Sequence, residues 1–289
     1  MARPSPPEGK GKPEISQLTS GTSYYGEASF FPDGRWLTFP LGSSTGKTNI
    51  YKMQLSGGQP IQLTFFEHAL AASPAWSPDG QHIAFVSQQN GSSKIWMVNA
   101  NGGAAQPLER TNATDGNNKL SWFPSPEIVY QIAGVRNLRR INGKTQEEQL
   151  LIHDPSVGWL PLRPIFSPDG KNVAVNWNRD PDGGIWTISL EPYSETPLLA
   201  HKGNDDNAPM GWSPDGKYVY ATQGREIVKV GIANPNQPVS VVTLPGDVVA
   251  YLSGGMSPDG RDIVVPLSEA KSDVWIMENF DPAFSRTTK

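Results

Sequence analysis

The chain has no cysteine. A disulfide, a thiolate-ligated metal and a cysteine nucleophile are therefore all excluded. The chain also has no run of about 18 consecutive apolar residues, the shortest length that spans a bilayer as a helix. We therefore expect no direct insertion into a membrane. Positive charge is not in excess either, since the formal net charge is −4, and this balance disfavours nucleic acid and anionic membrane surfaces as partners.

The first residues also lack the apolar stretch of a signal peptide. Residues 1–13 are polar and contain four prolines, so we interpret them as a flexible linker. The linker favours a domain of a longer protein, for which we expect a periplasmic or other extracytoplasmic location; a complete cytoplasmic protein is the alternative. We place the folded domain at residues 14–280 and a C-terminal tail at residues 281–289.

What the chain does contain is one short phrase in six copies. They read FFPDG at 30–34, WSPDG at 76–80, a degraded WFPSP at 122–126, FSPDG at 166–170, WSPDG at 212–216 and MSPDG at 256–260. Successive prolines of the phrase are 44 or 46 residues apart. A fixed period in this range indicates a repeat architecture, so the repeat predicts the fold before any single residue is considered.

Each phrase predicts a tight turn. Proline presets φ at the first central position, aspartate suits the second, and glycine adopts the left-handed conformation that follows. This is the pattern of a three-residue β-hairpin loop with a glycine bulge. We therefore expect positive φ at the glycines of the complete SPDG copies, which are Gly80, Gly170, Gly216 and Gly260.

Alternating apolar residues follow each turn, as at Leu37 and Phe39. Alternation with a period of two is the signal of a half-buried strand. A third run such as IWMV at 95–98 and a fourth, weaker run such as IQLT at 61–64 complete the unit. Four antiparallel strands in each unit of about 45 residues make the blade of a β-propeller. The six units therefore predict an all-β, six-bladed β-propeller.

The two ends of the chain are predicted to close the ring. The last unit stops after its third run, at residues 274–277, whereas residues 15–19 resemble a fourth run without a unit of its own. We therefore expect the N-terminal strand to complete the sixth blade, which also removes two exposed sheet edges. The third unit has lost a residue, and we expect Ile128 and Tyr130 to fill its buried strand positions.

The repeated hairpin resembles the TolB-type, WD-like propeller repeat. The resemblance is carried by the pattern [FW]-S-P-D-G-x-x-[IV]-x-[FV] followed by I-W-x-[MV] and N-x-x-G-G, and it is clearest at residues 76–103. It covers the whole predicted ring and implies a six-bladed propeller. It leaves the function open, because such repeats occur in periplasmic TolB, in propellers attached to serine peptidases and in sensor-like domains of membrane-tethered kinases and regulators.

Three short motifs imitate chemical sites. Residues 42–46 match the G-x-S-x-G nucleophile pattern and residues 42–48 imitate a phosphate-binding loop, but neither leads into a predicted helix. Residues 178–183 begin like a calcium loop, yet the twelfth position is Ser189 instead of glutamate. We interpret all three as loops, with a weak calcium site as the alternative for the third.

The histidines form no motif. His82 lies in a predicted strand, while His68, His153 and His201 precede different strands at different distances, each with acidic residues nearby. A metal or acid–base site is the alternative to independent loop histidines. We predict no catalytic residue, no metal and no cofactor, so the protein is not expected to be an enzyme.

One face remains as the candidate binding surface. The loops between blades open opposite the turns and carry aromatic and polar residues, which protein-binding sites favour. We predict a non-catalytic binding or scaffold module, monomeric as an isolated domain, that engages a protein or peptide at this face or at the channel mouth. The alternatives are an extracytoplasmic sensor domain of a larger membrane-tethered kinase or regulator that binds a small ligand, and a carbohydrate-active or metal-dependent enzyme. The predicted binding residues are Tyr25, Glu27, Glu67, His68, Asn117, Trp159, Asp206, Asn207 and Tyr251.

Overall fold

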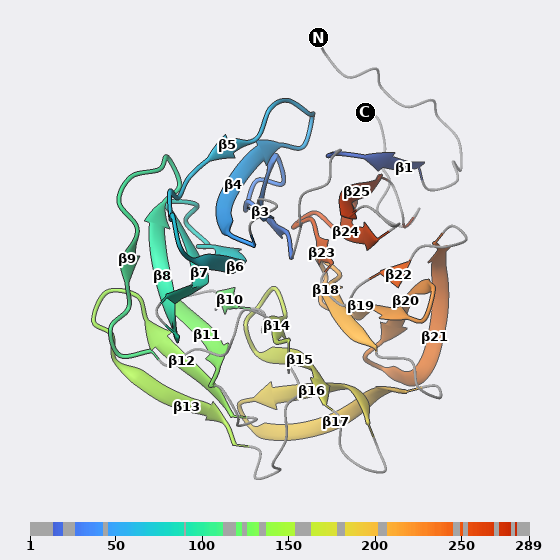
Figure 1. Cartoon of the computed structure of the whole chain (residues 1–289). Helices are drawn as coiled ribbons and strands as arrows, with labels where there is room; N and C mark the ends of the chain where they lie inside the picture. Colours follow the sequence, from blue (N-terminus) through green and yellow to red (C-terminus); the bar gives the residue numbers. More distant parts are fainter. Residues whose placement is uncertain are drawn as a thin grey trace.

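The protein is a ring of β-sheets arranged around a central axis (Figure 1). In this computed structural model, all regular elements among the described residues are strands, which confirms the predicted all-β class and the propeller architecture. The structure describes residues 14–19, 27–42, 46–89, 91–111, 120–122, 126–132, 137–153, 163–177, 183–201, 207–244, 249–250, 254–268, 272–278 and 281.

Three of the sheets contain four antiparallel strands each, in sequence order. Each corresponds to one copy of the repeat, and the degraded third copy forms its sheet like the others. The strands are β10 (Ser121–Trp122), β11 (Glu127–Gln131), β12 (Leu138–Asn142) and β13 (Glu148–Ile152); β14 (Ile165–Phe166), β15 (Asn172–Trp177), β16 (Gly184–Leu190) and β17 (Tyr193–Ala200); and β18 (Ala208–Trp212), β19 (Tyr218–Gln223), β20 (Glu226–Gly231) and β21 (Asn234–Thr243).

The first two copies of the repeat share one eight-stranded sheet. A single parallel pairing of Thr48 with Leu70 joins them, and the Thr48 hydroxyl makes 2.7 Å hydrogen bonds with both the N–H and the carbonyl oxygen of Ala71. The described residues therefore form five hydrogen-bonded sheets, fewer than the six predicted, because this bridge merges two. The strands are β2 (Ser29–Phe30), β3 (Trp36–Gly42), β4 (Thr48–Gln54), β5 (Ile61–Gln62), β6 (Leu70–Trp76), β7 (His82–Gln89), β8 (Ser92–Asn99) and β9 (Gln106–Pro107).

The remaining sheet joins the two ends of the chain. The N-terminal strand β1 pairs antiparallel with β25, and Ile15 lies opposite Met277. The predicted closure is therefore confirmed. Ile15 also packs against the apolar cluster that contains Met277 and Ile263. The strands of this sheet are β1 (Glu14–Gln17), β22 (Val249–Ala250), β23 (Gly255–Met256), β24 (Ile263–Ser268) and β25 (Ser272–Glu278).

The first strands of the repeats form the inner wall of the ring. Successive inner strands are in contact around the axis, and the last of them, β23, contacts the first, β2. The core lies between neighbouring sheets, since buried residues of adjacent repeats share clusters, as Val129 does with Val173. The second-strand residues that alternation predicted are buried, Ile128 and Tyr130 of the third copy among them.

The repeated turns have the predicted conformation. Gly80, Gly170, Gly216 and Gly260 have φ of 67°, 71°, 70° and 72°. In the fourth copy the Ser167 hydroxyl donates to Asp169 at 2.6 Å and accepts from the N–H of Asn172 at 2.9 Å. The bond from Ser167 lowers the pKa of Asp169. The serines of the other three complete SPDG copies make the same two bonds, so each of these four phrases ties its own turn to the start of the second strand.

Tryptophan side chains tie the third and fifth repeats to the repeats before them. The indole N–H of Trp122 donates to the carbonyl oxygen of Ala75 at 2.9 Å, and that of Trp212 donates to the carbonyl oxygen of Ile165 at 2.9 Å. Each acceptor lies in the inner strand of the preceding copy. A buried indole N–H needs such an acceptor, and the fixed repeat length supplies it.

Deletion of residues 1–19 is expected to destabilise the ring. The deletion removes four register pairs with β25 and the packing of Ile15, a loss on the order of 3–5 kcal/mol that corresponds to a fall of about 10 °C in melting temperature. Deletion of residues 1–13 alone is the control and should leave the melting curve unchanged. Equal melting temperatures for the two truncations would refute the role of β1.

Gly80→Ala is expected to cost more stability than Gly216→Ala. Both glycines have positive φ, which costs an L-residue about 1 kcal/mol, but only at Gly80 would the added Cβ lie 2.6 Å from ring carbons of Phe31. That ring packs edge-to-face on Trp76, a contact of about 1 kcal/mol. In urea unfolding, the excess cost should vanish when Phe31→Ser is combined with Gly80→Ala; if it persists, the ring is not its cause.

Candidate functional site: the channel mouth

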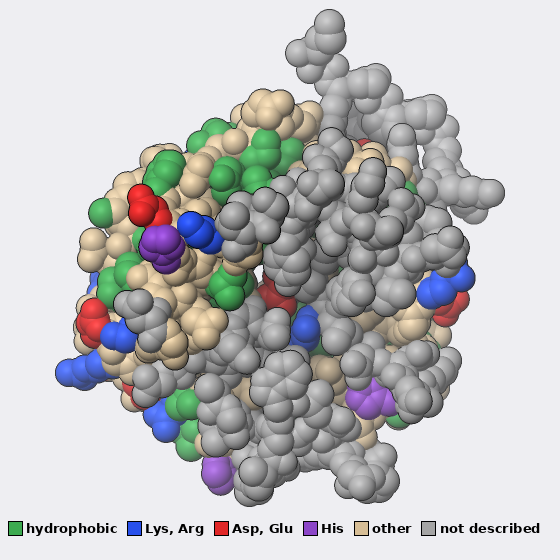
Figure 2. Space-filling model, viewed as in Figure 1, with side chains coloured by type: hydrophobic (Ala, Val, Ile, Leu, Met, Phe, Trp, Pro, Cys, Tyr) green, Lys and Arg blue, Asp and Glu red, His purple; other side chains and the backbone are tan. Residues whose placement is uncertain are grey.

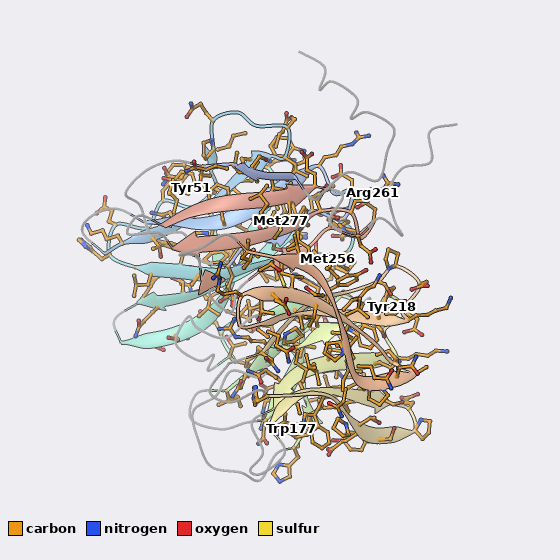
Figure 3. All side chains as sticks on the ribbon, turned by 90° about the vertical axis from the view of Figure 1, so that its right-hand side faces the viewer. Tyr51, Trp177, Tyr218, Met256, Arg261 and Met277 are labelled. Atoms are coloured by element: carbon orange, nitrogen blue, oxygen red, sulfur yellow. The ribbon has the colours of Figure 1, made fainter. Side chains whose placement is uncertain are left out.

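The inner strands begin at the face opposite the repeated turns, because each of them runs into its turn. In the side view, Tyr218 and Arg261, which lie next to two turns, stand toward the right-hand face (Figure 3). Figure 2 shows the other face, with acidic and basic side chains near its centre. This second face is the mouth predicted from the sequence, and the residues that precede the inner strands lie there.

A buried ion pair spans the channel at this level. The Oε1 atom of Glu27 lies 3.6 Å from Nη1 of Arg163, and each side chain is only 10% exposed. Glu27 precedes β2 and Arg163 precedes β14, and β14 is the inner strand farthest from β2 in the order of contacts around the ring. The pair therefore links opposite sides of the wall. Arg163 has φ of 46°, a conformation that few non-glycine residues adopt.

Two oxygen acceptors at the mouth are buried without a hydrogen-bond donor among the described residues. They are Oε2 of Glu27 and Oδ1 of Asn207. Asn207 is fully buried, and its amide donates to the carbonyl oxygen of Ala200 at 3.1 Å. Since most buried polar atoms in native proteins have a partner, both oxygens are places where a ligand with N–H groups would gain hydrogen bonds.

Other predicted site residues lie elsewhere. Glu67 and His68 are exposed in the connection between β5 and β6, so they belong to the rim and not to the buried pair. Glu27 and Asn207 are at the mouth as predicted, but they are buried. The remaining predicted binding residues fall outside the described part of the chain: Tyr25, Asn117, Trp159, Asp206 and Tyr251.

The described histidines do not converge. His153 is exposed and its Nδ1 lies 3.1 Å from Oδ1 of Asn137, and His201 has a buried Nδ1. Among the described residues, no three side chains of His, Cys, Asp or Glu are grouped closely enough to hold a metal. None of the described residues forms a helix long and apolar enough to cross a membrane. The calcium-like stretch 178–182 lies outside the described residues.

Arg163 was not predicted to pair with Glu27. Both residues precede an inner strand, but sequence separation gives no sign that two such residues meet across the axis. Their contact requires the closed ring, in which the third inner strand after β2, which is β14, lies opposite β2. The only signal in the sequence was an arginine that a single proline separates from an inner strand.

Neutralising one member of the Glu27–Arg163 pair is expected to destabilise the ring more than neutralising both. Glu27→Gln or Arg163→Met leaves a buried charge, at a cost of about 3–5 kcal/mol. The double variant should recover at least about 2 kcal/mol in a urea-unfolding double-mutant cycle. The exposed pair Lys217–Asp215 is the control and should couple by less than about 1 kcal/mol. Equal coupling in both cycles would contradict the buried pair.

Comparison with known proteins gives several curated relatives, two of which illustrate the similarity. No family model matches the chain. A TolB homologue of Chlorobium chlorochromatii is 28% identical over 163 residues, which cover 55% of this chain and 33% of that protein. The uncharacterized peptidase YuxL of Bacillus subtilis is 25% identical over 173 residues, which cover 60% of this chain and 24% of that protein. The chain thus matches only a quarter to a third of the length of these relatives.

Solved structures share the ring. A putative TolB from Agrobacterium tumefaciens superposes with a TM-score of 0.66 at 17% identity, over 91% of this chain and 96% of that chain. An oligogalacturonate lyase in complex with manganese superposes with a TM-score of 0.59 at 18% identity, over 92% of this chain and 78% of that chain. At these identities the likeness concerns the fold alone. The TolB homologues among the curated relatives and the TolB structures among the fold neighbours support the resemblance of the repeated hairpin to the TolB-type β-propeller family.

Proposed function

We propose that this propeller is a non-catalytic binding module that engages a protein or peptide at the channel mouth. We count its blades as six, because the eight-stranded sheet contains two copies of the repeat and a single residue pair joins the strands of one copy to those of the other. On this count each blade contributes one inner strand and one connection to the mouth. The mouth therefore combines connections of different sequence with the buried polar side chains of Glu27, Arg163 and Asn207.

The observation that carries the proposal is the pair of buried acceptors, Oε2 of Glu27 and Oδ1 of Asn207. A carboxylate and an amide oxygen suit the N–H groups of a peptide backbone, a lysine or an arginine. The neighbouring Arg163 guanidinium would hold the Glu27 carboxylate in place. A donor-bearing segment that enters the mouth would therefore be recognised at its tip.

Aromatic rim residues would supply most of the affinity. We propose Tyr25 and Trp159 as anchors, because large aromatic side chains dominate most protein-binding surfaces. Glu67, His68, Asn117, Asp206 and Tyr251 would complete the rim. Truncation of an anchor to alanine would cost about 2 kcal/mol or more in affinity, roughly thirtyfold.

We further propose that the chain acts outside the cytoplasm as one domain of a longer protein and is monomeric by itself. The match to only part of each curated relative supports the proposal that the chain is one domain of a longer protein. One alternative is a sensor domain of a membrane-tethered kinase or regulator that binds a small ligand. The other is a carbohydrate-active or metal-dependent enzyme. The two alternatives predict a small-molecule ligand or a bound metal, whereas our proposal predicts a macromolecular partner.

The test is site-specific photocrosslinking in cells that produce the natural, full-length protein. A photoreactive amino acid is placed at Glu67 or His68 on the rim, and at Lys217 on the turn face as the matched exposed control. We expect one protein to be captured from both rim positions and not from Lys217. The purified partner should then lose about thirtyfold in affinity for Trp159→Ala. Capture mainly from Lys217, or no capture from the rim, would contradict the proposal.

A further inference from the structure

A second candidate site lies away from the mouth, on the turn face, at the seam between the first two repeats. It is a groove of about 470 Å³. One wall comes from the first turn and from β3 and β4, and the other comes from the second turn and the segment after β8. Its lining combines aromatic and polar side chains. The aromatic residues are Phe31, Trp36 and Trp76, and the polar residues include Lys52, Asp33, Gln81 and Asn99.

Phe31 makes this seam different from the others. Four of the other turns have serine at this position, and that hydroxyl is spent inside its own turn. Phe31 has no hydroxyl; its ring instead leaves the turn, crosses above Gly80 and packs edge-to-face on Trp76 with 4.7 Å between ring centroids. The first repeat thereby gains an apolar wall where other repeats have a closed turn.

Lys52 supplies the charge in the groove. Its ammonium lies 5.1 Å from the centre of the Trp36 ring and donates to the carbonyl oxygen of Ala100 at 2.6 Å. An ammonium has three N–H donors, so the hydrogen bond to Ala100 leaves capacity for a further acceptor. The indole N–H of Trp76 is buried and has no acceptor among the described residues, although Trp122 and Trp212 use theirs.

The same arrangement occurs once more in the chain, and there it holds a carboxylate. Tyr218 and Lys229 occupy the strand positions of Trp36 and Lys52, in the same pairing register, and the Lys229 ammonium lies 5.4 Å from the Tyr218 ring centre. The carboxylate of Asp281 accepts from Lys229 at 2.6 Å and from the Tyr220 hydroxyl at 2.6 Å. Tyr218 stands on the turn face in Figure 3.

Asp281 follows β25 just as Ala100 to Gly102 follow β8. The chain's own segment thus fills the later seam with an aspartate that is 2% exposed. In the first seam, the corresponding segment offers Lys52 only a backbone carbonyl oxygen. The two seams therefore have related lysine and aromatic groups, but only in the later one does a carboxylate of the chain bind the lysine.

We propose that the groove between the first two repeats binds an acidic peptide segment of a partner protein. An aspartate of that peptide takes the place at Lys52 that Asp281 takes at Lys229, and an adjacent apolar side chain packs on Phe31 and Trp36. Asp33, exposed in the groove, is the one acidic side chain of the lining and weakens binding by repulsion. This site is independent of the channel mouth.

The chain provides the probe for this proposal. The peptide Asn-Phe-Asp-Pro-Ala, blocked at both ends, copies residues 279–283 around Asp281. It is titrated into the ¹⁵N-labelled protein while the indole signals of Trp36 and Trp76 are followed by NMR, assigned from Trp36→Phe and Trp76→Phe. We expect saturable shifts of both signals, and at least tenfold weaker binding by the same peptide with Asp281→Asn, because a charge-assisted hydrogen bond is lost.

Matched protein variants separate this site from general electrostatics. Lys52→Met is expected to weaken binding at least tenfold; methionine fits the strand, since Met97 occupies the same position in the next repeat. Lys171→Met removes the same charge from an exposed turn and should leave affinity unchanged. Asp33→Asn should tighten binding about twofold. Melting curves establish that each variant is folded.

Four outcomes would overturn the proposal. The first is equal affinity of the protein for the aspartate and asparagine peptides, and the second is an equal effect of Lys52→Met and Lys171→Met on that affinity. The third is that neither the Trp36 nor the Trp76 indole signal shifts with millimolar peptide. The fourth is binding of blocked aspartate alone as tightly as the peptide, which would make the ligand a small carboxylic acid. Loss of partner capture at the channel mouth would leave this result untouched, so the two proposals fail separately.

Discussion

The antiparallel pairing of β1 with β25 is the constraint on which the whole ring depends. Each sheet packs only against its two neighbours, so the position of every inner strand is fixed only when the last sheet meets the first. Ile15 and Met277 provide that meeting from opposite ends of the chain. Without it, the outermost edge of the last sheet would expose unpaired N–H and carbonyl groups. The contacts across the channel would also lose the geometry that they require.

Between its ends, the ring is held by contacts that recur with the repeat. The indole N–H groups of Trp122 and Trp212 reach a carbonyl oxygen of the preceding inner strand, and Thr48 bonds the backbone of Ala71 across the first seam. These bonds join main chain to side chain, so they are largely insensitive to what the mouth loops contain. A scaffold of this kind can keep its geometry while its loops vary, which is the usual division of labour between sheets and loops.

The parts of the fold that depend on local periodicity could be predicted from the sequence. The turn glycines, the alternating second strands and the spare strand at residues 15–19 all follow from the repeat. Apart from the closure of the ring by β1 and β25, contacts between distant side chains could not be predicted. The bridge from Thr48 that merges two sheets depends on one side chain, and the Glu27–Arg163 pair depends on the ring diameter. Two predicted site residues, Glu27 and Asn207, are at the mouth, but the alternation of loops and strands gave no information about their burial.

The closing strand also has a consequence for how the protein is made. Among the strands of the ring, β1 is synthesised first and its partner β25 last, so this pairing can form only after all the other strands have been made. Until then, intermediate forms carry open sheet edges and exposed apolar surface, which promote aggregation. The contacts of Trp122 and Trp212 with the preceding repeat would stabilise part of the growing ring before β25 is available.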